Sequence, residues 1–443
     1  MTAAVTPDRS CRAEIIAVGS ELLQPPRQDT NSLYITERLS GVGIDVRAKA
    51  VVGDSRPELE SVLRGAMRRA GLVILTGGLG PTDDDLTRDV VAAVLGVSMR
   101  EDPAVVERIR QRFATRGAAM PEVNRRQALV PDGAAILENR NGTAPGLWIE
   151  RADQTLVLLP GPPGELKPMF DRVVDERLAP RVGADRVYRR VLRVCGRTES
   201  EVEEAVLPVY GPWTAQPLPI VTTVLTAPAQ VELHLSVRAG DEAAAAVRLD
   251  GAVGELLAVL GADAFSTDGR TLEDVVGALL RSCGQTVAVA ESCTGGLVSS
   301  RLTDVSGSSD YVRFNAVCYS NDAKVRWLGV SPATLAAHGA VSEATALEMA
   351  DGIRAVAEAG IGIGVTGIAG PTGGTEAKPG GTVVVAVTTQ DVRVVRTFRF
   401  PFTRVRNKQF AAQMALDLVR RVLLRAEPGA AFVVRPPAGG AAR

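Results

Sequence analysis

Short apolar strands alternate with amphipathic helices along the first third of the chain. Ala13–Val18 and Leu72–Leu75 read as buried strands, and Ile44–Val52 alternates apolar with polar residues like a third strand. Helical patterns separate them, so the order is β-α-β-α-β. This alternation predicts a mostly parallel sheet covered by helices, with ligands beyond the carboxyl ends of its strands. We therefore expect a site at the loops after Val18, Leu75 and Leu159.

The length of 443 residues exceeds what one hydrophobic core usually organises. The fold class is predicted to be α/β, with a three-layer α/β domain over residues 1–170 and a C-terminal α/β domain over 263–428. Between them, 171–262 reads as a small α+β domain with a connecting or dimerising role. Residues 429–443 are rich in Pro, Gly and Ala and are predicted to be a mobile tail.

Composition points to a reducing compartment and gives no sign of a nucleic-acid or membrane partner. The net charge is −1, and the five cysteines never form a C-x-x-C pair. The sequence also lacks an apolar run of membrane-spanning length and a basic start followed by an apolar stretch. We therefore expect a cytoplasmic protein that does not use a membrane, with nucleic acid an unlikely partner.

Histidine is scarce, and this restricts the chemistry. The chain has His234, in an alternating strand-like run, and His338, at the end of a short helix before Gly339. A Ser-His-Asp triad or a multi-histidine metal site therefore has almost nothing to be built from. A general base is expected to be a lysine, a tyrosine or a carboxylate.

The first C-terminal motif is a small polar loop between a strand and a helix. Strand Thr286–Ala290 runs into Glu291–Gly296, and a helix follows. Such a turn places hydroxyl and backbone N–H groups at a helix N-terminus, where a phosphate or a developing oxyanion is stabilised. An ordinary N-capping loop is the alternative interpretation.

The second motif joins a strand, Phe314–Tyr319, to a helix that carries Lys324 near its start. Without histidine, a lysine or tyrosine of lowered pKa is a natural base for activating a serine. A single Tyr and a single Lys are, however, more often surface residues.

The third motif, Thr366–Thr375, is glycine-rich between two apolar strands and indicates close backbone approach to a ligand. Basic residues of 404–408, before the last helix, form either a phosphate contact or a solvated face.

Five segments in this order resemble the C-terminal domain of the CinA family. They are AESCTGG (290–296), YSNDAK (319–324), HGAVSE (338–343), TGIAGPTGG (366–374) and KPGGTV (378–383). The resemblance implies an amidohydrolase that needs no cofactor and converts nicotinamide mononucleotide to nicotinic acid mononucleotide and ammonia in pyridine-nucleotide salvage. It also implies a homodimer and small nucleotides as ligands.

By this resemblance Ser292 matches the family's essential serine, and Tyr319 and Lys324 match its tyrosine and lysine. Thr366 matches a substrate-contacting threonine. Arg404 matches the phosphate-side arginine, with Phe402-Thr403 in place of the usual Gly-Asp. We expect Ser292 to attack the carboxamide carbon, with Lys324 or Tyr319 taking its proton; direct attack by water is the alternative. Further substrate-binding residues are expected at Glu291, Cys293, Thr294, Gly295, Gly296, Asn321, Gly367 and Gly370.

The N-terminal motif GGLGPTDDD (77–85) places glycines and then three acids at a strand-to-helix junction. Glycines can approach a phosphate, and carboxylates can hold a hard cation, although clustered acids also cap helices. With neighbouring motifs this region resembles the molybdopterin-binding fold at the N-terminus of CinA proteins; Gln24–Arg27 stands where the family usually has a glycine-containing loop. The resemblance implies an ADP-ribose pyrophosphatase with Mg, Mn or Co at Asp83, Asp84 and Asp85. The expected site also includes Glu21, Asn31, Gly77, Gly78, Gly80 and Thr82.

Two rival functions belong to different classes of protein. The first domain alone would suit a pterin- or molybdopterin-binding protein, and the family name suggests an accessory protein for DNA uptake or repair. The neutral charge and the lack of basic stripes with interleaved aromatic residues count against the second. Ammonia release from nicotinamide mononucleotide separates the enzyme from both rivals.

Overall fold

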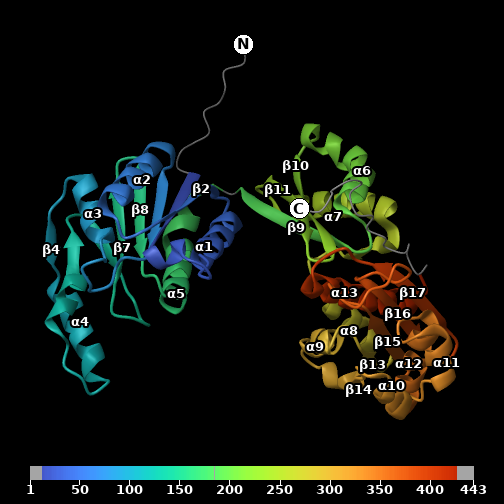
Figure 1. The fold of residues 1–443 in the computed structure, drawn as a ribbon. Coiled ribbons are helices and arrows are strands. Elements are labelled where there is room, and N and C mark those ends of the chain that lie inside the picture. Colours follow the sequence, from blue (N-terminus) through green and yellow to red (C-terminus); the bar gives the residue numbers. More distant parts are fainter. Residues whose placement is uncertain (1–11, 184, 427–443) are drawn as a thin grey trace. The chain divides into compact units, whose positions relative to one another are not determined.

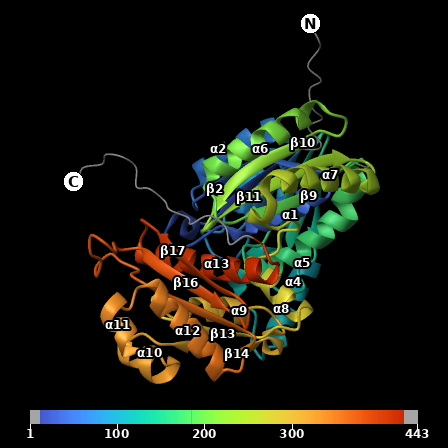
Figure 2. The same ribbon diagram turned by 90° about the vertical axis from the view of Figure 1, so that its right-hand side faces the viewer.

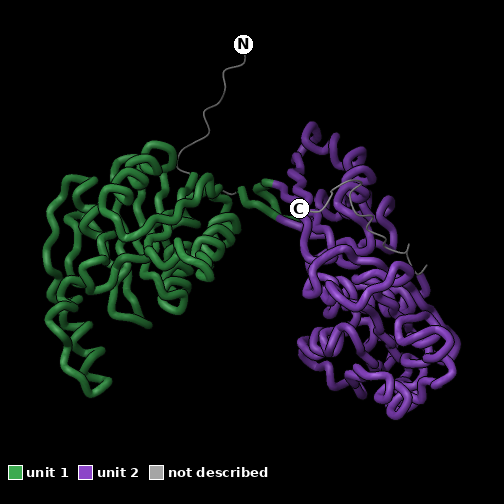
Figure 3. The backbone as a smooth tube through the Cα atoms, in the orientation of Figure 1, with its two compact units in different colours: residues 1–188, 238–243 green, residues 189–237, 244–443 purple. Residues whose placement is uncertain are grey.

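A computed structural model describes residues 12–183 and 185–426 of the chain. It divides into two compact units (Figure 3): unit 1 comprises residues 1–188 and 238–243, and unit 2 comprises 189–237 and 244–443. The expected tail at 429–443 lies outside the described residues.

Unit 1 is built on a six-stranded sheet. Its order is β2 (Asp45–Val52), β1 (Arg12–Val18), β3 (Leu72–Thr76), β8 (Gln154–Leu159), β7 (Gly146–Arg151) and β6 (Ala134–Leu137). The first four strands run parallel, and β7 and β6 each run antiparallel to their neighbour. The strands predicted from the apolar runs are therefore present, and their carboxyl ends lie at one edge of the sheet.

Helices cover both faces of this sheet (Figure 1). Successive strand residues point to opposite faces, so Ile15 packs with α1 (Thr30–Gly41) and α5 (Pro163–Val173), whereas Ile16 packs with α2 (Arg56–Arg69) and α3 (Thr87–Leu95). The three-layer α/β arrangement predicted from the sequence is confirmed. Outside these layers lie α4 (Pro103–Ala114) and a two-stranded sheet of β4 (Met99–Glu101) and β5 (Leu129–Pro131).

Unit 2 begins with a four-stranded sheet. Its order is β10 (Ile220–Ala227), β11 (Gln230–Ala239), β9 (Arg186–Val194) and β12 (Ala264–Ser266), with α6 (Glu199–Tyr210) and α7 (Glu242–Leu260) beside it (Figures 1 and 2). His234 lies on β11, as the alternating pattern predicted. Arg421 forms an ion pair of 2.7 Å with Asp263, so this sheet region is tied to the C-terminal domain.

A five-stranded sheet forms the C-terminal domain. Its order is β14 (Val312–Val317), β13 (Val287–Glu291), β15 (Ile361–Gly367), β16 (Thr382–Thr388) and β17 (Arg393–Arg399). The strands β14, β13 and β15 are parallel, whereas β16 and β17 return antiparallel. The loops that leave the three parallel strands therefore meet at one edge.

Helices again cover both faces, which confirms an α/β fold for this domain. One face carries α8 (Leu272–Ser282), α9 (Leu297–Thr303) and α13 (Arg404–Leu423); the other carries α10 (Asn321–Leu328), α11 (Pro332–His338) and α12 (Glu343–Val356). Glycines on β15 allow α12 to approach closely, because a Cβ on Gly362 or Gly364 would lie 2.0 or 2.2 Å from a carbonyl oxygen of α12.

Among the described residues, no helix is both long and apolar enough to cross a lipid bilayer. The described cysteines, at positions 195, 283, 293 and 318, are free thiols.

Candidate functional sites

Two strand-end loops bring Ser292 and Lys324 together in unit 2. Ser292 directly follows β13, and its N–H donates to the carbonyl of Val365 on β15 at 2.9 Å. Lys324 lies in the first turn of α10, whose N-cap Ser320 accepts from the Ala323 N–H. From there the Lys324 ammonium donates to Ser292 Oγ at 3.2 Å. Two residues far apart in the sequence thus form a hydrogen-bonded serine–lysine pair.

The environment of Lys324 favours its neutral form. Its side chain is 1 % exposed, and its other two hydrogen bonds go to the carbonyls of Cys318 and Tyr319, both at 3.0 Å. All three acceptors are uncharged oxygens. Burial lowers the pKa of Lys324 below its ordinary range, because the ammonium loses water that carbonyls replace only in part. A lysine of this kind can take a proton from a neighbouring hydroxyl.

Glu291, which the sequence analysis expected among the substrate-binding residues, caps helix α9. It is fully buried. One carboxylate oxygen accepts from the N–H groups of Gly296 and Val298, and the other accepts from the N–H and hydroxyl of Ser299. These four bonds occupy the carboxylate and stabilise the positive end of α9.

The Ser292 turn leaves two backbone donors for a ligand. The Gly295 N–H donates to the carbonyl of Ser292 at 3.1 Å, and the Gly296 N–H donates to Glu291. The N–H groups of Cys293 and Thr294 find no acceptor within 12–183 and 185–426. Unpaired backbone N–H groups at such a turn are the kind of donor that can stabilise an oxyanion.

The side chains of these two residues are buried. Desolvation raises the pKa of the Cys293 thiol to about 12, so it stays uncharged and is a poor nucleophile at neutral pH. The Thr294 hydroxyl is also buried and has no hydrogen-bond partner in the described chain. Of the three polar side chains at 292–294, the Ser292 hydroxyl is the one in hydrogen-bond contact with Lys324.

The phenol of Tyr319 is hydrogen-bonded to Arg404 and not to the serine–lysine pair. The strand β14 ends at Val317, two residues earlier than predicted, and Tyr319 lies in the following loop with 61 % of its surface exposed. Its phenol oxygen accepts from Arg404 at 3.3 Å, whereas its backbone carbonyl holds Lys324. Lys324, and not the phenol of Tyr319, is thus the titratable side chain hydrogen-bonded to Ser292 Oγ.

The other predicted residues of this site form hydrogen bonds elsewhere, are exposed or serve packing. Thr366 is buried at the end of β15 and donates to the carbonyl of Ala340 at 2.7 Å. Arg404 donates to the carbonyl of Gly370 at 3.2 Å, and it is the first residue of α13 and not a residue before it. Asn321 is exposed at the start of α10. A Cβ on Gly367 would lie 2.7 Å from the carbonyl of Thr382, so this glycine serves strand packing.

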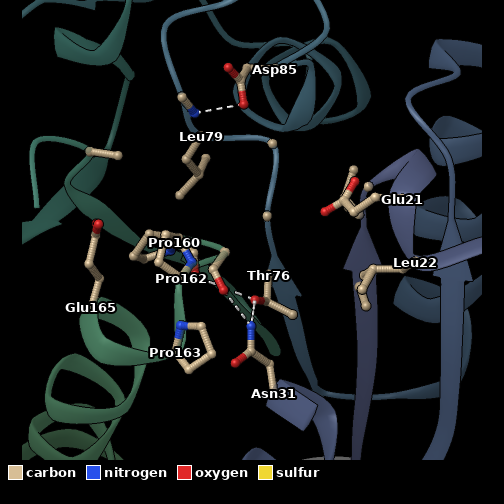
Figure 4. Close-up of a pocket in the computed structure, with 18 of the residues that line it drawn as sticks. Glu21, Leu22, Asn31, Thr76, Leu79, Asp85, Pro160, Pro162, Pro163 and Glu165 are labelled. Carbon is tan, nitrogen blue, oxygen red and sulfur yellow. Dashed lines mark hydrogen bonds between the residues drawn. The ribbon is translucent and has the colours of Figure 1, made fainter. Parts of the chain in front are cut away.

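Unit 1 contains a cavity of about 550 Å³ at the carboxyl ends of β1, β3 and β8 (Figure 4). The loops after Val18, Leu75 and Leu159 meet here, as predicted. Figure 4 shows Glu21 and Glu165 on opposite sides, with Asn31 and Thr76 between them. Of the predicted residues, those that line the cavity are Glu21, Asn31, Gly77, Gly78, Gly80, Asp84 and Asp85.

Hydrogen bonds from the start of α1 to the end of β3 and to the loop after β8 shape this cavity. Asn31 donates to the carbonyl of Gly161 at 2.7 Å and to the Thr76 hydroxyl at 3.3 Å. Gly77 has a φ of 98°, and a Cβ there would lie 2.1 Å from the carbonyl of Val18. Only glycine lets the first and second loops approach so closely.

The three acids predicted to hold a metal do not converge. Asp83 is exposed, pairs with Arg126 and does not line the cavity. Asp85 accepts from the Gly80 N–H at 2.8 Å and from the N–H and hydroxyl of Thr82, so it caps its own loop. Within the described residues, no group of three acids, histidines or cysteines could hold a metal ion. The residues present therefore do not fit a ready-made divalent-metal site.

Sequence reasoning missed one wall of the cavity. Thr143 and Ala144 line it, and Asn139 holds their loop in place by donating to Glu165 at 2.7 Å and to the carbonyl of Ala144 at 2.8 Å. The Asn-Gly turn at Asn141 was the available signal, but such a turn indicates a loop and does not say what the loop contacts. Asn407 in unit 2 was likewise not assigned a place in a site, whereas Lys408 belongs to the basic residues of 404–408 that were expected to form a phosphate contact or a solvated face.

Comparison with known proteins agrees with both halves of the structure. Residues 14–180 match the family model "Probable molybdopterin binding domain", and residues 269–423 match "CinA C-terminal domain". A CinA-like protein of Koribacter versatilis is 45% identical over 416 residues, covering 93% of this chain and 100% of that protein. One of Solibacter usitatus is 44% identical, covering 92% and 97%. A crystal structure of the protein CinA from Thermoplasma acidophilum is 31% identical, with a TM-score of 0.36, covering 38% of this chain and 98% of that one.

These features define a two-unit α/β protein that joins a molybdopterin-binding-like domain to a domain with a buried serine–lysine pair. The chain belongs to the CinA family.

Proposed function

We propose that unit 2 hydrolyses the carboxamide of nicotinamide mononucleotide to nicotinic acid mononucleotide and ammonia. The observation that carries this proposal is the 3.2 Å hydrogen bond between the buried Lys324 amine and Ser292 Oγ. A buried lysine next to a serine is a base and nucleophile in contact, which is what acyl transfer requires. The identity of the substrate rests on the family resemblance of the motifs around this pair.

The reaction begins with neutral Lys324, which accepts the Ser292 proton as Oγ attacks the carboxamide carbon. The N–H groups of Cys293 and Thr294 then hold the oxyanion of the tetrahedral intermediate. When the C–N bond breaks, Lys324 returns the proton to the leaving nitrogen, which departs as ammonia. Water, deprotonated by Lys324, hydrolyses the acyl-serine and restores both side chains.

Ammonia release from nicotinamide mononucleotide by the full-length chain tests this proposal. We expect Ser292→Ala and Lys324→Met each to lower kcat by at least about 10²-fold, since each removes one partner of the chemical step. Rapid quench with substrate labelled in the ring should trap label on wild-type protein and not on Ser292→Ala. Near-normal turnover by Ser292→Ala would refute the nucleophilic role.

The matched control is Cys283→Ala, which changes an exposed thiol outside the serine loop and should leave turnover unchanged. If all variants release ammonia equally, the serine–lysine pair is not the site. If Lys324→Met loses activity while Tyr319→Phe retains most of it, the base is Lys324 and not the phenol.

The cavity of unit 1 favours a second candidate function, the hydrolysis of ADP-ribose to AMP and ribose 5-phosphate. Its volume of about 550 Å³ suits a nucleotide, and glycine loops approach it at strand ends. AMP production from ADP-ribose, with and without added Mg, Mn or Co, tests this. Asp84→Asn should lower the rate, whereas Asp83→Asn, outside the cavity, should not. Equal rates for both variants and wild type would exclude Asp84 from the reaction.

A further inference from the structure

Thr87, the first residue of α3, holds two carbonyls of the glycine loop that lines the cavity of unit 1. Its side chain is fully buried. The hydroxyl donates to the carbonyl of Gly77 at 2.8 Å, and the Thr87 N–H donates to the carbonyl of Gly78 at 3.2 Å. A Cβ on Gly78 would lie 2.3 Å from the Thr87 hydroxyl oxygen, so the loop is in direct contact with the start of the helix.

This contact fixes the direction of two backbone N–H groups. In a trans peptide, the C=O and the N–H of the same unit point in opposite directions. The N–H groups of Gly78 and Leu79 share peptide units with the two held carbonyls, so they point away from Thr87. Both residues line the cavity, and neither N–H has an acceptor within 12–183 and 185–426. They are donors available to a ligand.

Arg88 places a buried positive charge behind the same loop. It is 3 % exposed and donates to the carbonyls of Leu79 and Gly80 at 2.7 and 2.8 Å. Burial lowers the pKa of Arg88 to about 10, and the charges of Asp85 and Asp89 offset this only in part, so the group remains a cation at neutral pH. Its hydrogen bonds to carbonyls leave its charge less compensated than an ion pair would.

The rest of the cavity wall does not favour an anion. Arg27 is the basic residue among those that line it, and the acids that line it are Glu21, Asp29, Asp54, Asp84, Asp85 and Glu165. These carboxylates repel a negative group from the other parts of the wall. The glycine loop, with two unused N–H groups and a cation behind it, is the part that suits a phosphate oxygen.

We propose that Thr87 and Arg88 are positioning residues for the reaction of unit 1. Thr87 directs the N–H groups of Gly78 and Leu79 toward a phosphate group of the substrate. Arg88 supplies the positive charge that holds this phosphate group among acidic walls. Neither residue lines the cavity, so each acts through the glycine loop. This inference rests on the second candidate function, the hydrolysis of ADP-ribose, and deepens it.

Steady-state kinetics of ADP-ribose hydrolysis by the full-length protein test the role of Thr87. Thr87→Val keeps the shape of the side chain but removes the hydroxyl, and we expect it to raise KM by at least about tenfold with little change in kcat, because a misdirected N–H weakens phosphate binding. Thr87→Ser keeps the hydroxyl and should restore most of the affinity. Thr115→Val is the matched control, since the Thr115 hydroxyl donates to a carbonyl at the end of α4, outside the cavity. A lower kcat with unchanged KM in Thr87→Val would show a purely structural role and overturn the proposal.

Calorimetry with inorganic diphosphate, without added metal, separates this inference from the hydrolase function. Wild-type protein and Thr87→Ser should bind the diphosphate, and Thr87→Val and Arg88→Met should bind it at least about tenfold more weakly. Arg110→Met, which breaks an exposed ion pair with Glu107 on α4, should bind it like wild type. This pattern supports the proposal even if no AMP is formed from ADP-ribose. Equal binding by all variants, or no binding by wild type, refutes it even if wild-type protein hydrolyses ADP-ribose.

A measurement on the unchanged protein decides the question if Thr87→Val or Arg88→Met does not fold. In isotope-labelled wild-type protein, diphosphate should shift the N–H resonances of Gly78 and Leu79 downfield. The N–H of Gly80 already donates to Asp85 and serves as an internal control that should move less. Unshifted resonances of Gly78 and Leu79 at saturating diphosphate would contradict the role given to Thr87.

Discussion

At the scale of single residues, the hydrogen-bond partners of a polar side chain show what it does in the candidate site. Lys324 donates to Ser292 and to two carbonyls, whereas the Glu291 carboxylate accepts hydrogen bonds from α9. Both residues stand in the motifs that indicated a site, yet Lys324 contacts Ser292 and Glu291 caps a helix. Sequence reasoning found the motifs but could not distinguish these roles, since both residue types occur at strand-to-helix turns for either purpose.

The lowered pKa of Lys324 gives a prediction for the pH profile. The amine acts as base only when neutral, so kcat/KM should rise as pH passes upward through the pKa of Lys324. Burial puts that pKa below the ordinary lysine value of 10.5, and the ascending limb should have its midpoint below that pH. Lys324→Arg stays charged and should show no ascending limb. An activity that falls with rising pH over this range would contradict the assignment of Lys324 as the base.

At the scale of elements, glycine decides how closely helices and strands approach. Gly362 and Gly364 on β15 face α12, where ordinary side chains would meet the carbonyls of Ala350 and Ala346. The sequence predicted an apolar strand directly before the glycine-rich motif Thr366–Thr375, and β15 is that strand. It did not predict that its glycines serve packing, because a glycine in a strand can equally mark a bulge or a ligand.

Gly364→Ala is therefore expected to destabilise the protein. The added Cβ would lie 2.2 Å from the Ala346 carbonyl, so α12 must move away from β15, at a cost of about 3 kcal/mol in unfolding free energy. Chemical denaturation monitored by circular dichroism measures it. Gly251→Ala on α7, where the Cβ meets no atom within 4 Å, should instead stabilise by up to about 1 kcal/mol. A neutral effect of Gly364→Ala would mean that α12 is not tightly packed on β15.

At the scale of the whole molecule, a buried ion-pair network joins the four-stranded sheet region to the C-terminal domain within unit 2. Asp417 pairs with Arg420 at 2.6 Å and with Arg421 at 2.7 Å, and all three are nearly inaccessible. Arg421 also reaches Asp263. The sequence predicted a middle domain over 171–262 and a C-terminal domain after it, and residues 189–237 and 244–262 of that middle region lie in the same compact unit as the C-terminal domain.

Asp417→Ala should destabilise unit 2 by about 3–5 kcal/mol, because it leaves two buried guanidinium groups with fewer partners. Calorimetry of the full chain is expected to show the transition of unit 2 at a lower temperature and that of unit 1 unchanged. Arg393→Ala, which breaks an exposed pair with Asp351, should cost less than about 1 kcal/mol. Equal shifts for both variants would show that the buried network adds no more than a surface pair.

The sequence by itself determined the order of strands and helices, the three glycine loops of unit 1 and the motifs that carry Ser292 and Lys324. These follow from local periodicity and turn chemistry, which act over a few residues. Only the tertiary structure decided that Lys324 meets Ser292, that the phenol of Tyr319 turns to Arg404, and that Asp83, Asp84 and Asp85 do not form one cluster. Such contacts depend on which strand ends are neighbours and on which acceptor lies within reach of each donor. Both are decided by packing between segments that are distant in the sequence.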